Sequence, residues 1–250
     1  LFKITSKISE VTFNECLIPG IQGGPLFAMM ETLVTQELWE KVMGGNPSRF
    51  KGAQLPVESI SWHSGILFCN RLSELFGFIP AYKSIDSDDE YYKGRYILIK
   101  GANGFRLPFE REWVFSAKGG ENYKYSGSNN IDEVAWHNGN NSGLTHPVGQ
   151  KKANGYGLYD CSGNVGEWCA DAARSWHDKV GETGRSAAYH GSSSKEGCII
   201  STDSGQAGVE SSYNTIGLRL CRSLSELKTE TICLEAVKDS GGALEYVPEE

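Results

Sequence analysis

The chain has 250 residues and a formal net charge of −7, with 39% hydrophobic, 22% charged and 11% aromatic residues. This composition predicts one large domain or two small ones with a real core, and it excludes collagen, coiled coil and wholesale disorder. No run of about 18 apolar residues predicts a membrane-spanning helix, and an acidic chain without Lys/Arg clusters is not expected to bind nucleic acid.

Two short helices are predicted within the first 85 residues. Thr35 is an N-cap candidate for a helix over 34–43, which has one apolar face and ends at Gly44. A second helix follows Ser61 and ends at Gly77. The apolar residues of both helices are expected in the core.

The middle of the chain combines one strand with a long irregular region. An acidic loop at 86–90 precedes a strand over 91–100, and it lacks the Gly and terminal Glu of an EF-hand, so we expect solvated carboxylates rather than a calcium loop. Segment 119–155 is rich in Gly, Asn and Ser, which predicts irregular structure held by a few buried rings. Those rings are Tyr123, Tyr125, Trp136 and His137.

The cysteines and the chain ends give three further expectations. The seven cysteines form no C-x-x-C pair and no zinc-ligand spacing, and their count is odd. The chain begins at Leu1 without an initiator methionine, so we expect a trimmed form with any signal or lipid-anchor segment upstream. Residues 223–250 carry seven acidic side chains against two lysines and are expected to form a solvated acidic extension.

Eight short strings occur in a fixed order between about Glu31 and Arg222. They are ETLVTQ (31–36), VMGGNPSRF (42–50), PVESISW (56–62), FCNRLS (68–73), FRLPFEREW (105–113), NGYGLYD (154–160), GNVGEW (163–168) and IGLRL (216–220). One such string is weak evidence, whereas eight in order are specific. In this succession the chain resembles the formylglycine-generating-enzyme (sulfatase-modifying factor) family.

The resemblance implies an α+β fold of the C-type-lectin-like kind, with a small twisted antiparallel sheet, two helices and much irregular loop. It implies a single domain over 1–222, followed by the acidic extension. Arg106 and Glu112 are expected to pair as buried ions beside a helix start, with Pro108 in the first helical turn. The strings are expected to hold the scaffold rather than to carry chemistry.

The resemblance does not bring the family's catalytic residues with it. The family's enzyme oxidises a substrate cysteine with copper and oxygen, and it uses two cysteines spaced C-x4-C, because Cu(I) needs paired thiolates. In this chain Cys198 matches the second cysteine, but Ser193 stands five residues earlier, where the first belongs. We therefore expect no enzyme, no catalytic residue and no cofactor. A copper-dependent oxidase remains the alternative.

The motifs of two other catalytic chemistries are missing from the sequence. The iron-dependent branch of the family carries an HxxxHxE string, which is absent here, and a Ser193, His190 and Asp203 hydrolase has no nucleophile-elbow motif. The family also binds calcium near a GNxxEW string, which Asn164 and Glu167 match. We favour hydrogen-bonded buried side chains over a structural calcium ion at these two positions, and we predict no metal ligand.

Segment 184–215 differs in composition from the rest of the chain. Its 32 residues include eight Ser, five Gly and three Ala, with Tyr189 and Tyr213 as its only aromatics. Small polar residues with sparse Tyr are typical of adaptable contact surfaces. The segment lies between the GNVGEW and IGLRL strings, and loops that a rigid frame presents are common places for binding residues.

A fixed lectin-type frame with a permissive segment just before IGLRL resembles the variable proteins of diversity-generating retroelements, most closely that of Treponema. In that system template adenines are copied with errors, so that AAC and AAT codons change, but never to codons for Trp, Lys, Glu, Gln or Met. The resemblance therefore implies five fixed residues in and around the segment. They are Trp176, Lys195, Glu196, Gln206 and Glu210.

The same resemblance implies a ligand-binding surface over about 172–215, with Trp176, Tyr189 and Tyr213 as aromatic anchors. Its predicted residues are Arg174, Ser175, Trp176, His177, Asp178, Ser186, Ala188, Tyr189, His190, Gly191, Ser193, Ser194, Ser201, Asp203, Ser204, Ser212 and Tyr213. We expect a monomeric protein on the outer cell surface, anchored by lipid upstream of this chain, that binds a protein or cell-surface ligand. An undiversified member of the family and a mobile Ser/Gly loop without a partner are the alternatives.

Overall fold

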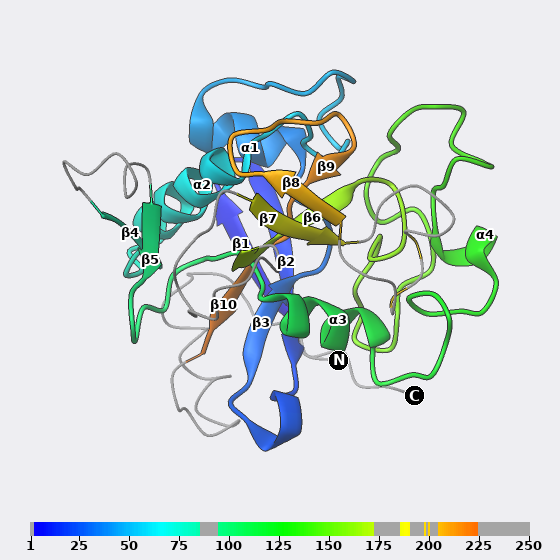
Figure 1. Cartoon of the computed structure of the whole chain (residues 1–250), viewed down its shortest axis with the longest axis horizontal. Coiled ribbons are helices and arrows are strands. Elements are labelled where there is room, and N and C mark those ends of the chain that lie inside the picture. The colour runs from blue at the N-terminus through cyan, green and yellow to red at the C-terminus, as the bar shows by residue number, and fades with distance from the viewer. Residues whose placement is uncertain are drawn as a thin grey trace.

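The computed structural model describes residues 3–85, 95–172, 186–190, 198, 200 and 205–224. Within these ranges, strands in two four-stranded sheets and one hairpin combine with helices and long loops (Figure 1), which confirms the expected α+β class. The elements in chain order are β1 (Lys3–Ile8), β2 (Val11–Ile18), the 3-10 turn η1 (Ile21–Gly23), β3 (Phe27–Met30), α1 (Gln36–Met43), α2 (Trp62–Leu75), β4 (Tyr82–Ile85), β5 (Arg95–Leu98), α3 (Glu110–Lys118), α4 (Ile131–Val134), β6 (Gly166–Ala172), β7 (Ser186–His190), β8 (Gly205–Gly208), β9 (Ile216–Gly217) and β10 (Cys221–Ser223).

The first sheet joins the N-terminal strands to the strand that follows the IGLRL string. Its order is β1-β2-β3-β10 and all its pairs are antiparallel, with Met29 of β3 opposite both Cys16 and Cys221. Strand β1 buries Ile4 and Ser6 and exposes Thr5 and Lys7, the two-residue alternation of a half-buried strand. The sequence interpretation predicted only helices and turns before residue 85 and missed these three N-terminal strands.

Both predicted N-terminal helices are confirmed, as is the predicted cap at Thr35. The Thr35 hydroxyl accepts a hydrogen bond from the Leu38 amide at 3.3 Å, and α1 ends at Gly44, whose φ of 80° suits glycine. Helix α2 begins after Ser61, which forms a reciprocal capping box with Ser64.

Helix α3 confirms the buried ion pair but corrects the position of its start. The Arg106 guanidinium donates to both Glu112 oxygens, at 2.6 and 2.8 Å. The N-cap is Phe109, whose amide donates to Glu112 at 2.9 Å, so Pro108 lies before the helix and not in its first turn. The Pro108 carbonyl instead accepts from the Ala170 amide of β6 at 2.8 Å.

The second four-stranded sheet has the order β8-β7-β6-β9, with β6 antiparallel to β7 and parallel to β9. The separate β4–β5 hairpin contains the described part of the strand predicted over 91–100. That strand ends at Leu98, and Lys100 lies beyond it in a turn. Residues 91–94 and the acidic loop at 86–90 lie outside the described residues.

Segment 119–155 is irregular as predicted, apart from the four-residue helix α4. Tyr125 and His137 are buried, and the half-buried Trp136 ring stacks on His146 with 3.8 Å between centroids. Tyr123 was wrongly expected to be buried, since 43% of it is exposed. Three of the four predicted rings therefore hold this region.

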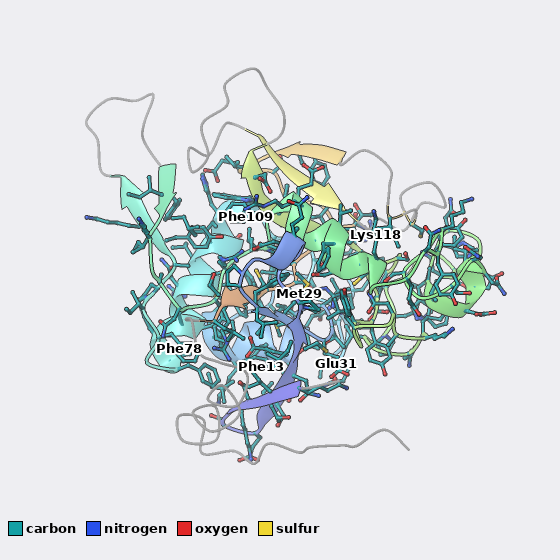
Figure 2. The ribbon with its side chains drawn as sticks, turned by 90° about the horizontal axis from the view of Figure 1, so that it is seen from below. Phe13, Met29, Glu31, Phe78, Phe109 and Lys118 are labelled. Carbon is teal, nitrogen blue, oxygen red and sulfur yellow. The ribbon has the colours of Figure 1, made fainter. Side chains whose placement is uncertain are left out.

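The core contains a cluster of aromatic rings on the side of the hairpin. Phe76 packs against Phe13, Phe78 and Phe105 with centroid distances of 5.8 to 6.1 Å, and Figure 2 shows Phe13 and Phe78 on the same side of the ribbon.

Within the described residues, no helix is long and apolar enough to cross a membrane.

Six of the seven cysteines lie in the described part of the chain, and all six are buried. Burial raises the pKa of Cys16 and Cys161 to about 12, so both stay protonated thiols at neutral pH. Cys233 and most of the predicted acidic extension, from residue 225 on, lie outside the described residues.

Candidate functional site

The frame of the candidate site is a buried carboxylate–guanidinium pair. Glu167 lies on β6 and Arg219 lies two residues beyond the end of β9, and both side chains are fully buried. Arg219 Nε and Nη2 each donate to the Glu167 carboxylate at 3.0 Å, and Trp113 Nε1 donates to it at 2.7 Å. These charge-assisted hydrogen bonds fix β6, one of the two inner strands of the second sheet.

The remaining donors of Arg219 connect this sheet to the first one. Arg219 Nη1 donates to the carbonyls of Met30 and Glu31 at 3.0 and 2.9 Å, and Nη2 donates to the Tyr159 carbonyl at 2.6 Å. One guanidinium therefore holds the end of β3, the NGYGLYD string and β6 together. The expectation that these strings serve the scaffold agrees with these contacts.

Asn164 and Glu167, which match the family's calcium string, both have protein partners. The Glu167 oxygens accept from Arg219, whereas the Asn164 amide exchanges two hydrogen bonds with the main chain of His146, at 3.1 and 2.9 Å. Within the described ranges no group of three or more His, Cys, Asp and Glu side chains is placed to hold a metal ion. These contacts support the hydrogen-bonded alternative at both positions.

The 209–215 loop, between β8 and β9, carries the two predicted ligand-binding residues whose side chains the structure describes. Its main chain is anchored, because the Tyr213 carbonyl accepts from the amides of Ser59 and Ile216 at 3.0 and 3.1 Å. The Tyr213 side chain is 47% exposed and Ser212 is exposed. Among the described residues, neither side chain makes a hydrogen bond, so neither is needed to hold the loop.

The segment under this loop is itself rigid. Ser59 has a positive φ of 59°, and its hydroxyl donates to the Glu58 carboxylate at 2.6 Å. Glu58 is fully buried and also accepts from the Phe50 amide at 2.9 Å. The loop after β8, drawn in orange in Figure 1, lies beside the start of α2.

A side-chain contact also links the loop to α2. His63, in the first turn of α2, bonds through Nδ1 to the Glu210 carboxylate, and its amide donates to the Val209 carbonyl at 3.4 Å. The sequence interpretation expected Glu210 to stay fixed but gave no role to His63 or Ser59. The PVESISW string contains Ser59 and directly precedes His63, so it was the sequence signal that could have indicated this support. The sequence interpretation assigns that string to the scaffold.

Four other predicted ligand-binding residues lie on β7. They are Ser186, Ala188, Tyr189 and His190. In the sheet register Tyr189 is opposite Trp168 of β6 and Gly205 of β8. Strand β7 therefore lies between β6, which the Glu167–Arg219 pair holds, and β8, which leads into the 209–215 loop. The remaining predicted residues lie outside the described part of the chain: Arg174, Ser175, Trp176, His177, Asp178, Gly191, Ser193, Ser194, Ser201, Asp203 and Ser204.

Cys198 is described, and it lies inside the protein. It is 1% exposed and belongs to an apolar cluster with Tyr125, Val134 and Ala135. The Ser162 hydroxyl donates to its main-chain carbonyl at 2.7 Å. A sulfur in this position is not accessible to a substrate cysteine.

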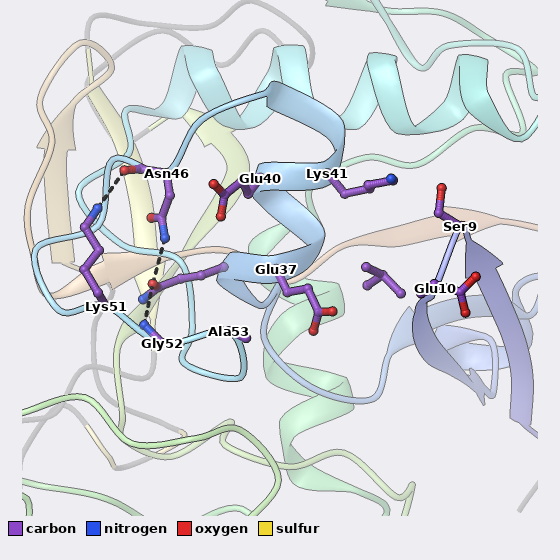
Figure 3. A pocket seen from close by; sticks show the side chains of 11 residues that line it. Ser9, Glu10, Glu37, Glu40, Lys41, Asn46, Lys51, Gly52 and Ala53 are labelled. Atoms are coloured by element: carbon purple, nitrogen blue, oxygen red, sulfur yellow. Dashed lines mark hydrogen bonds between the residues drawn. The ribbon is translucent and has the colours of Figure 1, made fainter.

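A cavity of about 840 Å³ lies between the β1–β2 turn and α1, away from the second sheet (Figure 3). Its polar groups are used locally: Lys51 Nζ donates to the Asn46 carbonyl at 2.7 Å, and Gln36 Oε1 accepts from the Asn46 amide group and the Gly52 amide. Because these contacts hold the 46–53 loop, we infer that the residues lining the cavity have a structural role rather than a ligand-binding one.

A smaller recess of about 430 Å³ adjoins the 209–215 loop. Trp39, Met43, Pro47 and Ile60 contribute its apolar lining. Ser59 also lines it and donates to Tyr213, so the recess and the loop share an edge. The recess is thus lined by scaffold residues and is joined to the loop through the main-chain bond from Ser59 to Tyr213.

Comparisons with known proteins identify the family. Residues 5–224 match the family model described as "Sulfatase-modifying factor enzyme 1-like domain". The chain is 42% identical over 172 residues, 58% of this chain and 60% of the relative, to "Chaperone protein LppX" of Paenibacillus barcinonensis. It is 37% identical over 163 residues to the formylglycine-generating enzyme of Mus musculus, of which these cover 34%. The chain thus spans less than two thirds of either relative.

The solved structure of Treponema denticola variable protein 1 superposes with a TM-score of 0.79 at 30% identity, over 89% of this chain and 99% of that protein. This match confirms the fold expected from the eight strings and the likeness to a variable protein. The family match extends over nearly all the described residues. The chain therefore belongs to the family of sulfatase-modifying factor enzyme 1-like domains.

Proposed function

We propose that this chain is a non-catalytic binding protein that presents a diversified ligand-binding face on a fixed scaffold. The face consists of β7, β8, the 209–215 loop and the predicted residues around 174–178, 191–194 and 201–204. One observation carries the proposal: the loop is held by its main chain and by Glu210, whereas the side chains of Ser212 and Tyr213 are exposed and hold nothing. Such positions tolerate replacement without loss of the fold.

The relatives support the same function. One is named a variable protein and another a chaperone protein. We propose that the chain acts outside the cell, as a monomer, held by a lipid anchor upstream of the present sequence. Its ligand is a protein or another cell-surface molecule, and the recess beside Tyr213 offers an apolar contact within that face.

The burial of Cys198 supports binding over oxidation. We expect no aldehyde when the protein is incubated with copper and a sulfatase-type peptide that contains the target cysteine, because Cys198 is buried and Ser193 replaces the other cysteine. Mass spectrometry of the peptide measures the product, with a formylglycine-generating enzyme as the positive control. Aldehyde that disappears in Cys198→Ala would show that the protein is an oxidase.

Tolerance of the loop is directly measurable. We expect Tyr213→Ser and Ser212→Tyr each to change the free energy of unfolding by less than about 0.5 kcal/mol, because both residues are exposed and neither side chain makes a hydrogen bond among the described residues. Ile216→Ser is the matched control three residues on, where the side chain is 2% exposed, and we expect it to lose more than about 2 kcal/mol. Urea unfolding compares the three. A loss at Tyr213 as large as at Ile216 would mean that the loop side chains belong to the scaffold.

A further inference from the structure

The contact between His63 and Glu210 joins the candidate binding face to the scaffold. His63 is in the first turn of α2, and 18% of its side chain is exposed, whereas 77% of the Glu210 side chain is exposed. The neighbouring residue Val209 accepts from the His63 amide and packs against the core. The bond therefore lies at the end of β8, where the chain enters the 209–215 loop.

The groups around the His63 imidazole come from the loop, from β5 and from α2 itself. Among the described side chains, the titratable groups that face it are Glu210 from the loop and Tyr96 from β5, whose ring centroid is 5.7 Å away. Burial and the Glu210 charge raise the pKa of Tyr96, so the phenol is neutral near pH 7. Trp62, with its centroid 5.6 Å from the imidazole, adds no charge.

We propose that His63 and Glu210 form a pH-dependent latch that positions the 209–215 loop. An imidazole ordinarily gains its proton between pH 8 and 5, and an imidazolium–carboxylate hydrogen bond is stronger than a neutral one. The loop is consequently held more tightly in acid, and Ser212 and Tyr213 are presented on a more rigid main chain. Regulation of binding by this latch rests on the proposed function, but the latch itself is a property of the loop. His63 and Glu210 act as positioning residues, because they hold the loop rather than contact a ligand.

Hydrogen–deuterium exchange of the full chain at pH 5.5, 6.5 and 8.0 tests the latch without a ligand. The amides of Ser211 and Ile216 report on the loop, because both are hydrogen-bonded within it. Their protection, corrected for the intrinsic chemical rate and divided by that of the core amide of Met30, is expected to be about two- to five-fold greater at pH 5.5 than at pH 8.0, the range for a partly exposed ion pair. Dividing by the protection of the Met30 amide removes the part of the pH dependence that comes from changes in global stability.

Two variants and one control decide the outcome. Glu210→Gln and His63→Gln keep polar side chains but remove the ion pair, so each is expected to abolish the pH dependence of loop protection. Glu40→Gln, an exposed carboxylate on α1, is expected to leave it unchanged. A wild-type loop without pH dependence, or a dependence that persists in Glu210→Gln, overturns the latch. Invariance of Ser212 and Tyr213 among isolates would instead overturn the diversified face and leave this measurement unaffected.

Discussion

Replacement of Arg219 by methionine is expected to lower the free energy of unfolding by about 3–5 kcal/mol, the cost of removing one partner of a buried ion pair. The loss leaves the Glu167 carboxylate charged in a fully buried place, with Trp113 Nε1 as its remaining donor among the contacts described above. The carbonyls of Met30 and Tyr159 also lose a donor. Urea unfolding at pH 7 measures the change in the free energy of unfolding. A variant that shows no cooperative unfolding transition would have lost at least the upper value of this range.

Two further variants identify the cause. Lys7→Met removes a cation from the exposed pair with Glu10, in which the side chains are 58% and 94% exposed, and should change stability by less than about 0.5 kcal/mol. The double variant Glu167→Gln with Arg219→Met removes the uncompensated charge and should recover part of the loss. If Arg219→Met were as stable as Lys7→Met, the guanidinium would not hold the two sheets together.

Replacement of Asp160 by asparagine is expected to raise stability above pH 7 by up to about 3 kcal/mol. Asp160 is 2% exposed; its Oδ2 accepts from the Gly149 amide at 2.7 Å, while Oδ1 has no hydrogen-bond partner among the described residues. Burial raises the pKa of this carboxyl to about 6, from 3.8. Asparagine suits the positive φ of 59° at this position and keeps the acceptor for Gly149.

The sign of the pH dependence follows from that raised pKa. Between about pH 4 and 6 the folded protein holds a proton that the unfolded chain has released, so the stability due to Asp160 is complete below pH 4 and is lost as pH rises through about 6. Thermal unfolding from pH 4 to 8 should show this decline in the wild type and a weaker one in Asp160→Asn. Asp132→Asn is the control with a pKa shift of the opposite sign, because the hydrogen bond with His137 lowers the pKa of that exposed carboxyl. Parallel profiles for wild type and Asp160→Asn would contradict the account.

Local features were the most predictable from the sequence. The caps at Thr35 and Ser61 and the stop at Gly44 depend on residues within about four positions, so the pattern contains all the information they need. The ion pair between Arg106 and Glu112 spans six residues and was also found, through the family resemblance. The eight ordered strings were sufficient for the fold because they occur throughout the domain.

Long-range features were not predictable from the residues. Strand β3 pairs with β10 at the other end of the chain, and the short apolar run at 27–30 does not reveal that partner. The acceptors of Arg219 come from segments distant in the sequence, so the IGLRL string indicated scaffold without indicating which elements it joins. For the candidate site, composition indicated the segment, which stays a prediction, and the exposure of Tyr213 and its support from Ser59 and His63 required the structure.

The central claim is that a fixed frame carries diversified residues, and sequencing of this gene and its downstream region in several isolates tests it most directly. We predict substitutions confined to about 172–215, with Trp176, Lys195, Glu196 and Glu210 unchanged, and a nearby template repeat with adenines at the varied codons. Changes spread evenly along the chain, without such a repeat, would contradict diversification and leave an undiversified member of the family.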